Sequence, residues 1–376
     1  MPKMDWPVKT LGQILELSYG KPLEAKDRDG NGSIPVYGAN GVKAYSKKSL
    51  VAGPSIIVGR KGSAGELNFC EGPFWPLDVT YYVEHDANET DLSFLHYLLS
   101  LMDLPSLAKG VKPGINRNDV YALQTTVPPL EEQKRIVELL DAANARVAEL
   151  TACYEQARTE ANNLFTSALR DALAPSDSWP VKRLGDLCLF VRGPFGGSLK
   201  KSVFVSTGHA VYEQQHAIYG KFDKFRYFVS ASKFQEMKRF EVFPGDILMS
   251  CSGTIGKTVI VPVGAPAGII NQALLKLSCS EKLNNQYLCV WMRSIYFQEA
   301  VFASVVGVAL QNVASVAILK NIPISLPPME QQKQIVVQLD LMRAKTSEMV
   351  SAYDAKLQAA KDLRQSILEA AFAGDL

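Results

Sequence analysis

The segment Gly253–Thr258, which reads GTIGKT, resembles the phosphate-binding loop of nucleotide hydrolases. That loop requires a glycine five residues before the glycine of its GK[ST] ending, and Cys251 occupies this position. The residues that follow, 258–261, favour a strand, whereas a phosphate-binding loop opens a helix whose N-terminus faces the phosphate. We therefore predict that this loop binds no nucleotide.

Other residue patterns that serve catalysis or metal binding are missing from the sequence. The four histidines show no metal-ligand spacing, and no two of the six cysteines are spaced as CxxC. The chain contains no HExxH or GxSxG, no N/D-PP-Y/F tetrapeptide of the adenine methyltransferase kind, no convincing glycine motif for S-adenosylmethionine and no evident PD…ExK nuclease pattern. We expect a non-catalytic chain with no metal site and no cofactor of its own.

A glycine-rich pattern, [GS]xxG[ST]xG, occurs twice, at Gly59–Gly65 and at Ser250–Gly256, each time between two segments that favour strands. The glycines can serve a tight turn that needs positive φ, or they can let the backbone approach a ligand. In the second case polar side chains of the loops would reach outward: Arg60, Lys61 and Ser63 in the first copy, and Ser252, Thr254 and Lys257 in the second. The sequence leaves both roles open.

These loops belong to a chain with an internal sequence duplication. WPVKTLG at residues 6–12 returns as WPVKRLG at 179–185, an offset of 173, and VPPLEEQKRIV at 127–137 returns as LPPMEQQKQIV at 326–336, an offset of 199. The second copy therefore carries 26 extra residues between its two landmarks. We predict four consecutive parts: a domain at 1–127, a helix at 128–175, a domain at 176–326 and a helix at 327–376.

Each Pro-Pro pair is expected to open a long helix, because proline is tolerated in the first turn and not in a helix interior. Apolar residues then recur at alternating steps of four and three, which over four heptads predicts a coiled-coil seam. The first seam comprises Ile136, Leu140, Ala143, Val147, Leu150, Tyr154, Ala157, Ala161, Leu164 and Ala168, and the second Ile335, Leu339, Met342, Thr346, Met349, Tyr353, Lys356, Ala360, Leu363 and Ile367.

The two seams match position for position, except at Thr346 and Lys356. This match favours two helices, each roughly 60 Å long at ~1.5 Å per residue, that pack on each other within one molecule. The alternative is that each seam lies on its own globular domain. Tyr154 and Tyr353 occupy seam positions and are expected to be packing residues.

The two globular copies, 34–127 and 203–326, are rich in Val, Ile, Phe and Tyr and are interrupted by Gly and Pro. This pattern predicts mixed α+β domains with curved sheets. Strands are expected at 55–58, 78–83, 246–249 and 258–261, and short helices at 92–102 and 284–302.

Charge is distributed unevenly along the chain, although its net value is only +2. Residues 178–326 hold 16 Lys and Arg against 8 Asp and Glu, whereas residues 1–127 have a net charge of −1, residues 128–177 of −4 and residues 327–376 of −1. A basic block between acidic or neutral ones suggests a surface that faces a polyanion. No run of 18 apolar residues occurs, and the N-terminus has no secretory core, so we expect a cytoplasmic protein without a membrane span.

The duplicated plan resembles the specificity subunits of type I restriction-modification systems. The resemblance rests on PPLEEQ and PPMEQQ at the helix starts, on WPVKTLG and WPVKRLGDL opening each variable domain, on the glycine loops, and on the ending AFAGDL at 371–376. It implies an α+β fold with two target recognition domains separated by two long antiparallel coiled-coil helices, internally duplicated with pseudo-twofold symmetry. It also implies that each domain contacts one half-site of a split DNA target.

The resemblance further implies partners. Two modification subunits, which carry S-adenosylmethionine and the methyltransferase site, would dock on the chain, and restriction subunits would join them to cleave DNA. ATP and Mg are then expected on those partners, and no membrane is involved. A chain with this plan but no DNA role would be a coiled-coil scaffold that presents two protein-interaction domains.

Candidate DNA-binding residues are the Lys and Arg that can pair phosphates or guanine, and the Asn, Gln, Ser, Thr and Tyr that can reach base edges. In the first domain they are Lys43, Tyr45, Lys47, Lys48, Arg60, Lys61, Ser63, Lys112, Asn116 and Arg117. In the second they are Lys200, Lys201, Tyr212, Gln214, Gln215, Lys221, Lys224, Arg226, Ser252, Thr254, Lys257, Gln311 and Asn312. Because the first domain has a net charge of −1, its basic residues would have to cluster locally.

Overall fold

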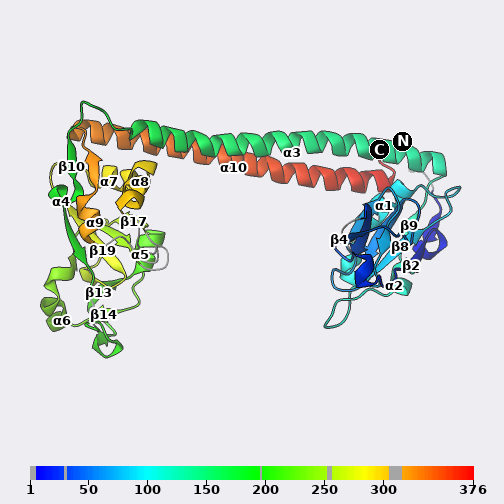
Figure 1. Ribbon diagram of the computed structural model, residues 1–376, viewed down its shortest axis with the longest axis horizontal. Coiled ribbons are helices and arrows are strands. Elements are labelled where there is room, and N and C mark those ends of the chain that lie inside the picture. The colour runs from blue at the N-terminus through cyan, green and yellow to red at the C-terminus, as the bar shows by residue number, and fades with distance from the viewer. Residues whose placement is uncertain (1–5, 29–31, 195–196, 252–255, 305–315) are drawn as a thin grey trace. The chain divides into compact units, whose positions relative to one another are not determined.

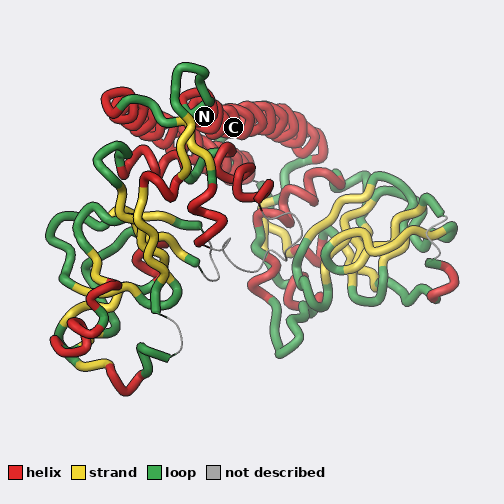
Figure 2. The backbone as a smooth tube through the Cα atoms, turned by 60° about the vertical axis from the view of Figure 1, so that its left-hand side comes forward, coloured by secondary structure: helices red, strands yellow, loops and turns green. Residues whose placement is uncertain are grey.

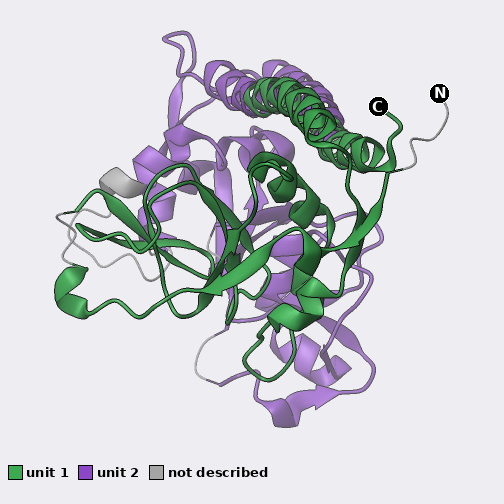
Figure 3. Ribbon diagram, turned by 90° about the vertical axis from the view of Figure 1, so that its right-hand side faces the viewer, with its two compact units in different colours: residues 1–156, 353–376 green, residues 157–352 purple. Residues whose placement is uncertain are grey.

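The computed structural model describes residues 6–28, 32–194, 197–251, 256–304 and 316–376. The chain divides into two compact units, residues 1–156 together with 353–376, and residues 157–352 (Figure 3). Each unit contains a globular domain of sheets and short helices and a share of both long helices, α3 (Leu130–Ala172) and α10 (Met329–Ala373). The predicted α+β class, with two β-rich domains and two long helices packed together, is confirmed.

The first globular domain contains an antiparallel four-stranded sheet in the order β2-β8-β5-β6. Its strands are β2 (Glu16–Tyr19), β8 (Thr80–Glu84), β5 (Ser55–Gly59) and β6 (Leu67–Cys70). A second sheet has the order β4-β3-β7, with β4 (Gly41–Ser46), β3 (Ile34–Gly38) and β7 (Trp75–Pro76). All five residues of β5 are buried, as expected of a central strand.

Helix α1 (Leu92–Leu101) covers one face of this four-stranded sheet. It begins at Asp91, whose side chain accepts a hydrogen bond from the N–H of Phe94 at 2.9 Å. Phe94, Leu95, Leu98 and Leu99 recur at helical spacing and are all buried in one cluster with strand residues. The aromatic ring of Phe372, near the end of α10, lies 5.0 Å from that of Phe94, so this end of α10 is fixed to the first domain.

The second globular domain repeats the four-stranded sheet as β11-β19-β16-β17. Its strands are β11 (Cys188–Arg192), β19 (Leu274–Cys279), β16 (Ile247–Ser250) and β17 (Thr258–Ile260). A five-stranded sheet has the order β12-β14-β13-β18-β15, with β12 (Phe204–Val205), β14 (Phe228–Val229), β13 (His209–Tyr212), β18 (Gly268–Ile270) and β15 (Glu241–Val242). The longer second copy therefore adds strands where the first domain has only three.

Short helices complete the second domain. They are α4 (Leu184–Leu187), α5 (Gln214–Tyr219), α6 (Ala231–Glu236), α7 (Asn285–Trp291), α8 (Ile295–Ser304) and α9 (Val316–Asn321) (Figures 1 and 2). The prediction of a single helix at 284–302 was wrong, because the chain turns between α7 and α8. The hydroxyl of Ser294 donates to the carbonyl of Trp291 at 2.6 Å and accepts the N–H of Phe297, which ends one helix and starts the next.

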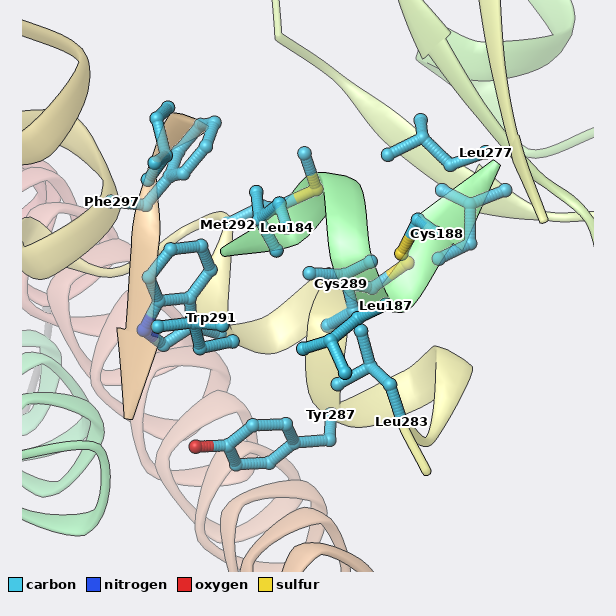
Figure 4. Close-up of a cluster of buried hydrophobic side chains, with 14 of the residues drawn as sticks. Leu184, Leu187, Cys188, Leu277, Leu283, Tyr287, Cys289, Trp291, Met292 and Phe297 are labelled. Atoms are coloured by element: carbon cyan, nitrogen blue, oxygen red, sulfur yellow. The ribbon is translucent and has the colours of Figure 1, made fainter. Parts of the chain in front are cut away.

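The core of the second domain gathers side chains from the sheet and from α4 and α7. Leu187, Cys188, Tyr287 and Trp291 lie together in it (Figure 4). Residues Ile335 and Leu339 of α10 and Leu169 of α3 belong to the same cluster, so the long helices contribute to this core directly.

Within the first unit α3 and α10 run in opposite directions side by side (Figure 1). Arg135 donates to the carbonyl of Leu376 at 3.0 Å, Arg364 donates to Asn144 at 3.0 Å, and the rings of Tyr154 and Tyr353 lie 6.4 Å apart. The partner number falls as the α3 number rises, which is the register of an antiparallel pair.

Burial is uneven along the predicted seam. Leu140, Val147 and Ala161 of α3 are buried, whereas Leu150 and Leu164 are 44% and 46% exposed. The equivalent residues of α10, Met349 and Leu363, are 41% and 47% exposed. The contact is therefore narrower than a full coiled-coil seam, and the exposed apolar residues recur at equivalent places on both helices.

The repeated sequence motifs close each domain in the same way. Strand β1 (Val8–Thr10) pairs antiparallel with β9 (Gln124–Thr126), and β10 (Val181–Arg183) pairs with β20 (Pro323–Ser325). Each pair joins the start of a domain to the strand that precedes its Pro-Pro motif.

A glutamine in the first turn of each long helix is fully buried. The side-chain oxygen of Gln133 accepts the N–H of Asp91 at 2.8 Å, and its amide nitrogen donates to the carbonyls of Glu89 and Pro128 at 3.0 and 2.9 Å. Gln332 makes the same three bonds in the second unit. Its side-chain oxygen accepts the N–H of Asn284 at 2.7 Å, and its amide nitrogen donates to the carbonyls of Lys282 and Pro327 at 3.0 and 2.9 Å. Both glutamines thus tie the helix start to the loop that leads into α1 or α7.

Candidate nucleic-acid interface

The two glycine-rich loops are closed by equivalent backbone hydrogen bonds in the two domains. In the first, the N–H of Gly65 donates to Gly59 at 2.7 Å and the N–H of Gly59 to Glu66 at 2.8 Å. In the second, Gly256 donates to Ser250 at 2.9 Å and Ser250 to Lys257 at 2.9 Å. Each loop joins two strands of a hairpin, β5 to β6 or β16 to β17.

Glycine is required at two points of the first loop. Gly65 has a φ of +84°, and a Cβ there would also lie 2.4 Å from the backbone of Pro105. A Cβ on Gly59 would lie 2.0 Å from the carbonyl oxygen of Ser63. The turn role of the glycines is therefore established for this loop, and the turn presents Arg60 and Lys61 on its outer side. Because β17 begins at Thr258, residues 256–258 lead into a strand, as predicted, and do not open a helix.

Arg60 and Arg117 converge on one aromatic ring. Their guanidinium carbons lie 4.9 and 5.1 Å from the ring centroid of Tyr19, which is 45% exposed. Arg60 also donates to the carbonyl of Asp78 at 3.0 Å. The ring of Tyr81 packs edge-on against Tyr19 at 5.0 Å, and burial raises the pKa of Tyr81, which keeps its hydroxyl protonated. We call Arg60, Arg117 and Tyr19 the arginine–tyrosine cluster.

A second loop lies against the first glycine turn. The N–H of Gly62 donates to the carbonyl of Pro113 at 2.9 Å, and the N–H of Ile115 donates to that of Arg60 at 3.0 Å. The loop tip carries Val111, whose side chain is fully exposed, and next to it the exposed Lys112. Helix α2 (Arg117–Tyr121) follows directly. The structure therefore brings Arg60, Lys61, Ser63, Lys112, Asn116 and Arg117 onto one part of the first domain, the local cluster that its net charge demands.

The remaining candidates of the first domain are placed elsewhere or have local tasks. Lys43 and Tyr45 are exposed on β4, and Lys47 is exposed just after it. Lys48 forms an ion pair with Asp27 at 3.0 Å. The side chain of Asn116 accepts the N–H of Asn118 at 3.0 Å and so caps α2.

In the second domain the candidates around α5 form another polar group. Gln215, Lys221 and Lys224 line a shallow pocket with His216 and Tyr219. Gln214 is half-buried at the first position of α5, and Arg226 lies over the ring of Tyr227 at 5.0 Å. Helix α5 packs on β16 and β17, and the exposed Lys257 stands where the glycine turn enters β17.

Buried His216 holds this group together through hydrogen bonds from both ring nitrogens to backbone atoms. One ring nitrogen, Nδ1, accepts the N–H of Glu213 at 2.9 Å, so the other, Nε2, carries the proton and donates to the carbonyl of Lys224 at 3.1 Å. His216 therefore fixes the segment that bears Lys221 and Lys224 against α5.

Tyr212 was predicted to contact DNA, and this prediction was wrong. Its side chain is fully buried in the core of the second domain, and its hydroxyl donates to the carbonyl of Pro266 at 2.6 Å. Burial raises the pKa of Tyr212 to about 12. Lys200 and Lys201 are exposed beside a short 3-10 helix, η4 (Lys201–Val203), away from α5 in sequence. Ser252, Thr254, Gln311 and Asn312 lie outside the described residues.

Sequence reasoning missed Tyr19 and the paired glutamines Gln133 and Gln332. Tyr19 ends a strand whose neighbours in the sequence give no sign of two arginines from residues 60 and 117. The glutamines do have a signal, since each stands at the same place in a repeated PPxExQ segment. A repeated polar residue at a position that helix charge does not explain points to a buried anchor.

The described residues provide neither a metal-ligand group nor a membrane-spanning helix. No group of three or more His, Cys, Asp or Glu side chains is placed to hold a metal ion among them. In the same residues, no helix combines the length and the apolar character that crossing a membrane would take.

Comparisons with known proteins match the whole plan of the chain. A family model described as the type I restriction modification DNA specificity domain matches residues 3–156 and 176–357. A Haemophilus influenzae protein assigned as the type I restriction enzyme specificity subunit S.HindORF215P is 27% identical over 370 residues, covering 92% of this chain and 89% of that protein.

Solved structures share the fold. A chain from a structure concerned with complex assembly and conformational transition of the type I restriction-modification system has a TM-score of 0.76 and 21% identity, with coverage of 100% of this chain and 99% of that one. The HsdS subunit from Thermoanaerobacter tengcongensis has a TM-score of 0.64 and 20% identity, with coverage of 100% and 98%. The similarity therefore extends over both globular domains and both long helices.

Proposed function

Because this chain belongs to the type I restriction-modification DNA specificity family and is a non-catalytic specificity subunit, we propose that each of its globular domains binds one short half of a split DNA target. The first domain, residues 1–127, and the second, residues 176–326, act as two independent readers. The helices at 128–175 and 327–376 hold them apart, and the bases between the two half-sites are not read.

The observation that carries this proposal is the arginine–tyrosine cluster beside the first glycine turn. Two guanidinium groups on one exposed ring are held in place before any ligand arrives, so little side-chain freedom is lost on binding. Arginine can pair phosphate oxygens or the O6 and N7 atoms of guanine in a bidentate manner. Lys61 and Lys112 flank the cluster and would add phosphate contacts.

The second domain would use a different set of side chains around the equivalent turn. Lys257 beside the turn, with Lys221, Lys224 and Arg226, supplies the charge, and Gln214 and Gln215 at the start of α5 supply groups that can pair adenine. The domain's net charge of +8 suits a larger share of the affinity that does not depend on sequence.

Two modification subunits are proposed to dock on the helix pair. Leu150 and Met349 are exposed apolar residues at equivalent positions, as are Leu164 and Leu363, which gives two similar apolar surfaces for two copies of one partner. Those partners would bind S-adenosylmethionine, and restriction subunits that join them would use ATP and Mg. A DNA target and such partners place the chain in the cytoplasm.

The proposal is tested by sequencing the methylated bases of a host that expresses this chain with its modification subunit. We expect adenine methylation at one motif made of two short parts with a fixed gap. Methylation at a single uninterrupted motif, or none above the level of a host without this chain, would contradict the two-reader proposal.

A further inference from the structure

A polar groove of about 330 Å³ lies in the first unit between α1, α3 and α10. Its walls include His96 and Tyr97 from α1, Asn144 from α3, and Lys361 and Arg364 from α10. The groove is separate from the glycine turn and from the arginine–tyrosine cluster in the residues that form it. None of these side chains is among the candidate DNA-binding residues, although Arg364 and Asn144 also join the two long helices.

A directional series of hydrogen bonds crosses the groove. Arg364 donates through Nε to Oδ1 of Asn144 at 3.0 Å, Asn144 donates through Nδ2 to the hydroxyl of Tyr97 at 3.0 Å, and Tyr97 donates to Asp141 at 2.5 Å. Asn144 and Tyr97 each accept from one neighbour and donate to the next, so the series starts at the Arg364 guanidinium and ends at the Asp141 carboxylate. The series uses Nε of Arg364 and fixes the plane of the guanidinium, while its two terminal nitrogens lie outside the series. A guanidinium held in this way is ready to bind an anion with two parallel hydrogen bonds.

Positive charge gathers in the groove without an acidic wall. This charge comes from Lys361 and Arg364, and none of the described lining residues is Asp or Glu. Asp141 is next to the groove but is bonded to Tyr97. Burial lowers the pKa of His96, and the charge of Arg364 lowers it further. Arg364 thus exerts a positive field on the groove that the protein does not neutralise there.

The second half of the chain does not repeat this groove. The helix offset of 199 places Arg343 where α3 has Asn144, and Phe165 where α10 has Arg364. Counting from the capping residues Asp91 and Asn284, Val290 replaces Tyr97. The hydrogen-bonded series cannot form with these residues, so the equivalent place in the second half does not carry this chemistry.

The surroundings favour a single carboxylate over a phosphate backbone. Residues 128–177 have a net charge of −4, and α10 adds Asp362 and Glu369 close to the groove in sequence. Duplex DNA brings one negative charge for about every 1.7 Å of its axis and would be repelled by that acidic surface. We propose that the groove binds the side-chain carboxylate of an Asp or Glu on one modification subunit, and so distinguishes the first docked copy from the second. This inference rests on the proposed function, which supplies the partner.

The test is a calorimetric titration of the full chain with its modification subunit. The Arg364→Met variant keeps the length of the side chain and removes the fork. We expect the unaltered chain to bind two copies, and the variant to bind one copy with unchanged affinity and the other at least tenfold more weakly. Arg364→Lys, which keeps the charge without the fork, should give a smaller loss. The matched control is Lys345→Met, an exposed cation on the same helix outside the groove, which should change neither affinity.

A second measurement needs no partner. Acetate added at constant ionic strength should raise the pKa of His96, followed by NMR, in the unaltered chain and not in Arg364→Met, because a bound carboxylate favours the imidazolium form.

Three results would overturn the proposal: equal affinities for both copies in the variant, equal weakening of both copies, or a loss of duplex DNA affinity caused by Arg364→Met in the chain alone. If the two-reader proposal itself fails, the unaltered chain will direct no split-motif methylation, which is independent of the number of copies bound in the titration.

Discussion

At the scale of single residues, the ring of Tyr19 positions the guanidinium groups of two arginines. Arg60 and Arg117 both lie about 5 Å from it, so their guanidinium groups are positioned by one partner and respond to its loss together. Each also donates to a backbone carbonyl, Arg60 to that of Asp78 at 3.0 Å and Arg117 to that of Leu17 at 3.5 Å, so Arg60 is held by the shorter bond. The two arginines therefore differ in how freely each can reach a base.

Replacing each arginine by glutamine should separate phosphate contact from base reading. A residue that pairs phosphate should weaken binding to all sequences and reduce the slope of log affinity against log salt by about 1. A residue that pairs guanine should cost ~1–3 kcal/mol on the target alone. Binding of the chain with its modification subunit to target and non-target duplexes, measured at several salt concentrations, checks this. Lys48→Gln is the control, because Lys48 is already paired with Asp27, and an effect as large as that of Arg60→Gln would contradict the assignment.

The buried glutamines allow a prediction about stability. Gln133→Ala leaves one N–H and two carbonyls without their partner, and each such group costs ~1–3 kcal/mol when it stays dry, so we expect a loss of about 3 kcal/mol in the free energy of unfolding of the first unit. The amide of Asp91 should exchange its hydrogen faster, while that of Asn284 in the second unit should not. The exposed neighbour Glu131→Ala serves as control, and equal exchange at Asp91 in both variants would show that Gln133 is no anchor.

At the scale of elements, the helix pair explains the two departures from the matched seams. The hydroxyl of Thr346 donates to the carbonyl of Met342 at 3.0 Å within its own helix, which satisfies a buried polar group. The ammonium group of Lys356 lies 5.3 and 5.4 Å from the rings of Tyr154 and Tyr353. A backbone carbonyl therefore accommodates Thr346 in the helix contact, and two aromatic rings accommodate Lys356.

Thr346→Val should raise the free energy of unfolding by about 0.5–1 kcal/mol. The equivalent residue of α3 is already valine, Val147, and an added buried methyl contributes ~0.8 kcal/mol while the lost hydrogen bond was to a carbonyl that the helix also uses. Denaturant unfolding monitored in the second unit measures the change. A decrease of more than about 1 kcal/mol would show that the hydroxyl supports the helix pair.

Deleting one heptad from both helices should shorten the gap between the half-sites. Seven residues remove about 10 Å of helix, which corresponds to roughly three base pairs. The methylated motif should then keep both halves and lose about three bases of gap. Deleting three residues instead rotates the part of each seam beyond the deletion by roughly 300°, so its apolar residues no longer face the partner helix and the pair should unfold. This deletion serves as the control. An unchanged gap after the heptad deletion would rule out the helices as the spacer.

Periodicity and repetition were enough to predict the long helices and the glycine hairpins, because both depend on neighbours in the sequence. The burial of Tyr212 was not predictable in this way. Its strand, β13, lies between β14 and β18, which follow it after many residues, and a tyrosine followed by Glu213, Gln214 and Gln215 reads as exposed. The same holds for Leu150 and Leu164, whose exposure depends on how closely the second helix approaches. The break at Ser294 was hidden because its apolar flanks continue the helical pattern.

At the scale of the molecule, the duplication predicts that the two readers are separable. Replacing residues 1–127 by the corresponding part of a relative should change one half of the methylated motif and leave the other half and the gap intact. Methylome sequencing of a host that carries the hybrid chain provides the measurement. A change in both halves would show that the domains read DNA as one unit.

The joint that Gln133 and Gln332 make has an evolutionary consequence. The six hydrogen bonds that these side chains make all go to the main chain, one N–H and two carbonyls in each half. These hydrogen bonds therefore depend on the backbone path of the incoming loop and not on the side chains that the loop carries. Recombination between genes can therefore insert a domain of unrelated surface chemistry beside an unchanged helix, and the joint still closes. New DNA specificities need not wait for compensating mutations in the spacer.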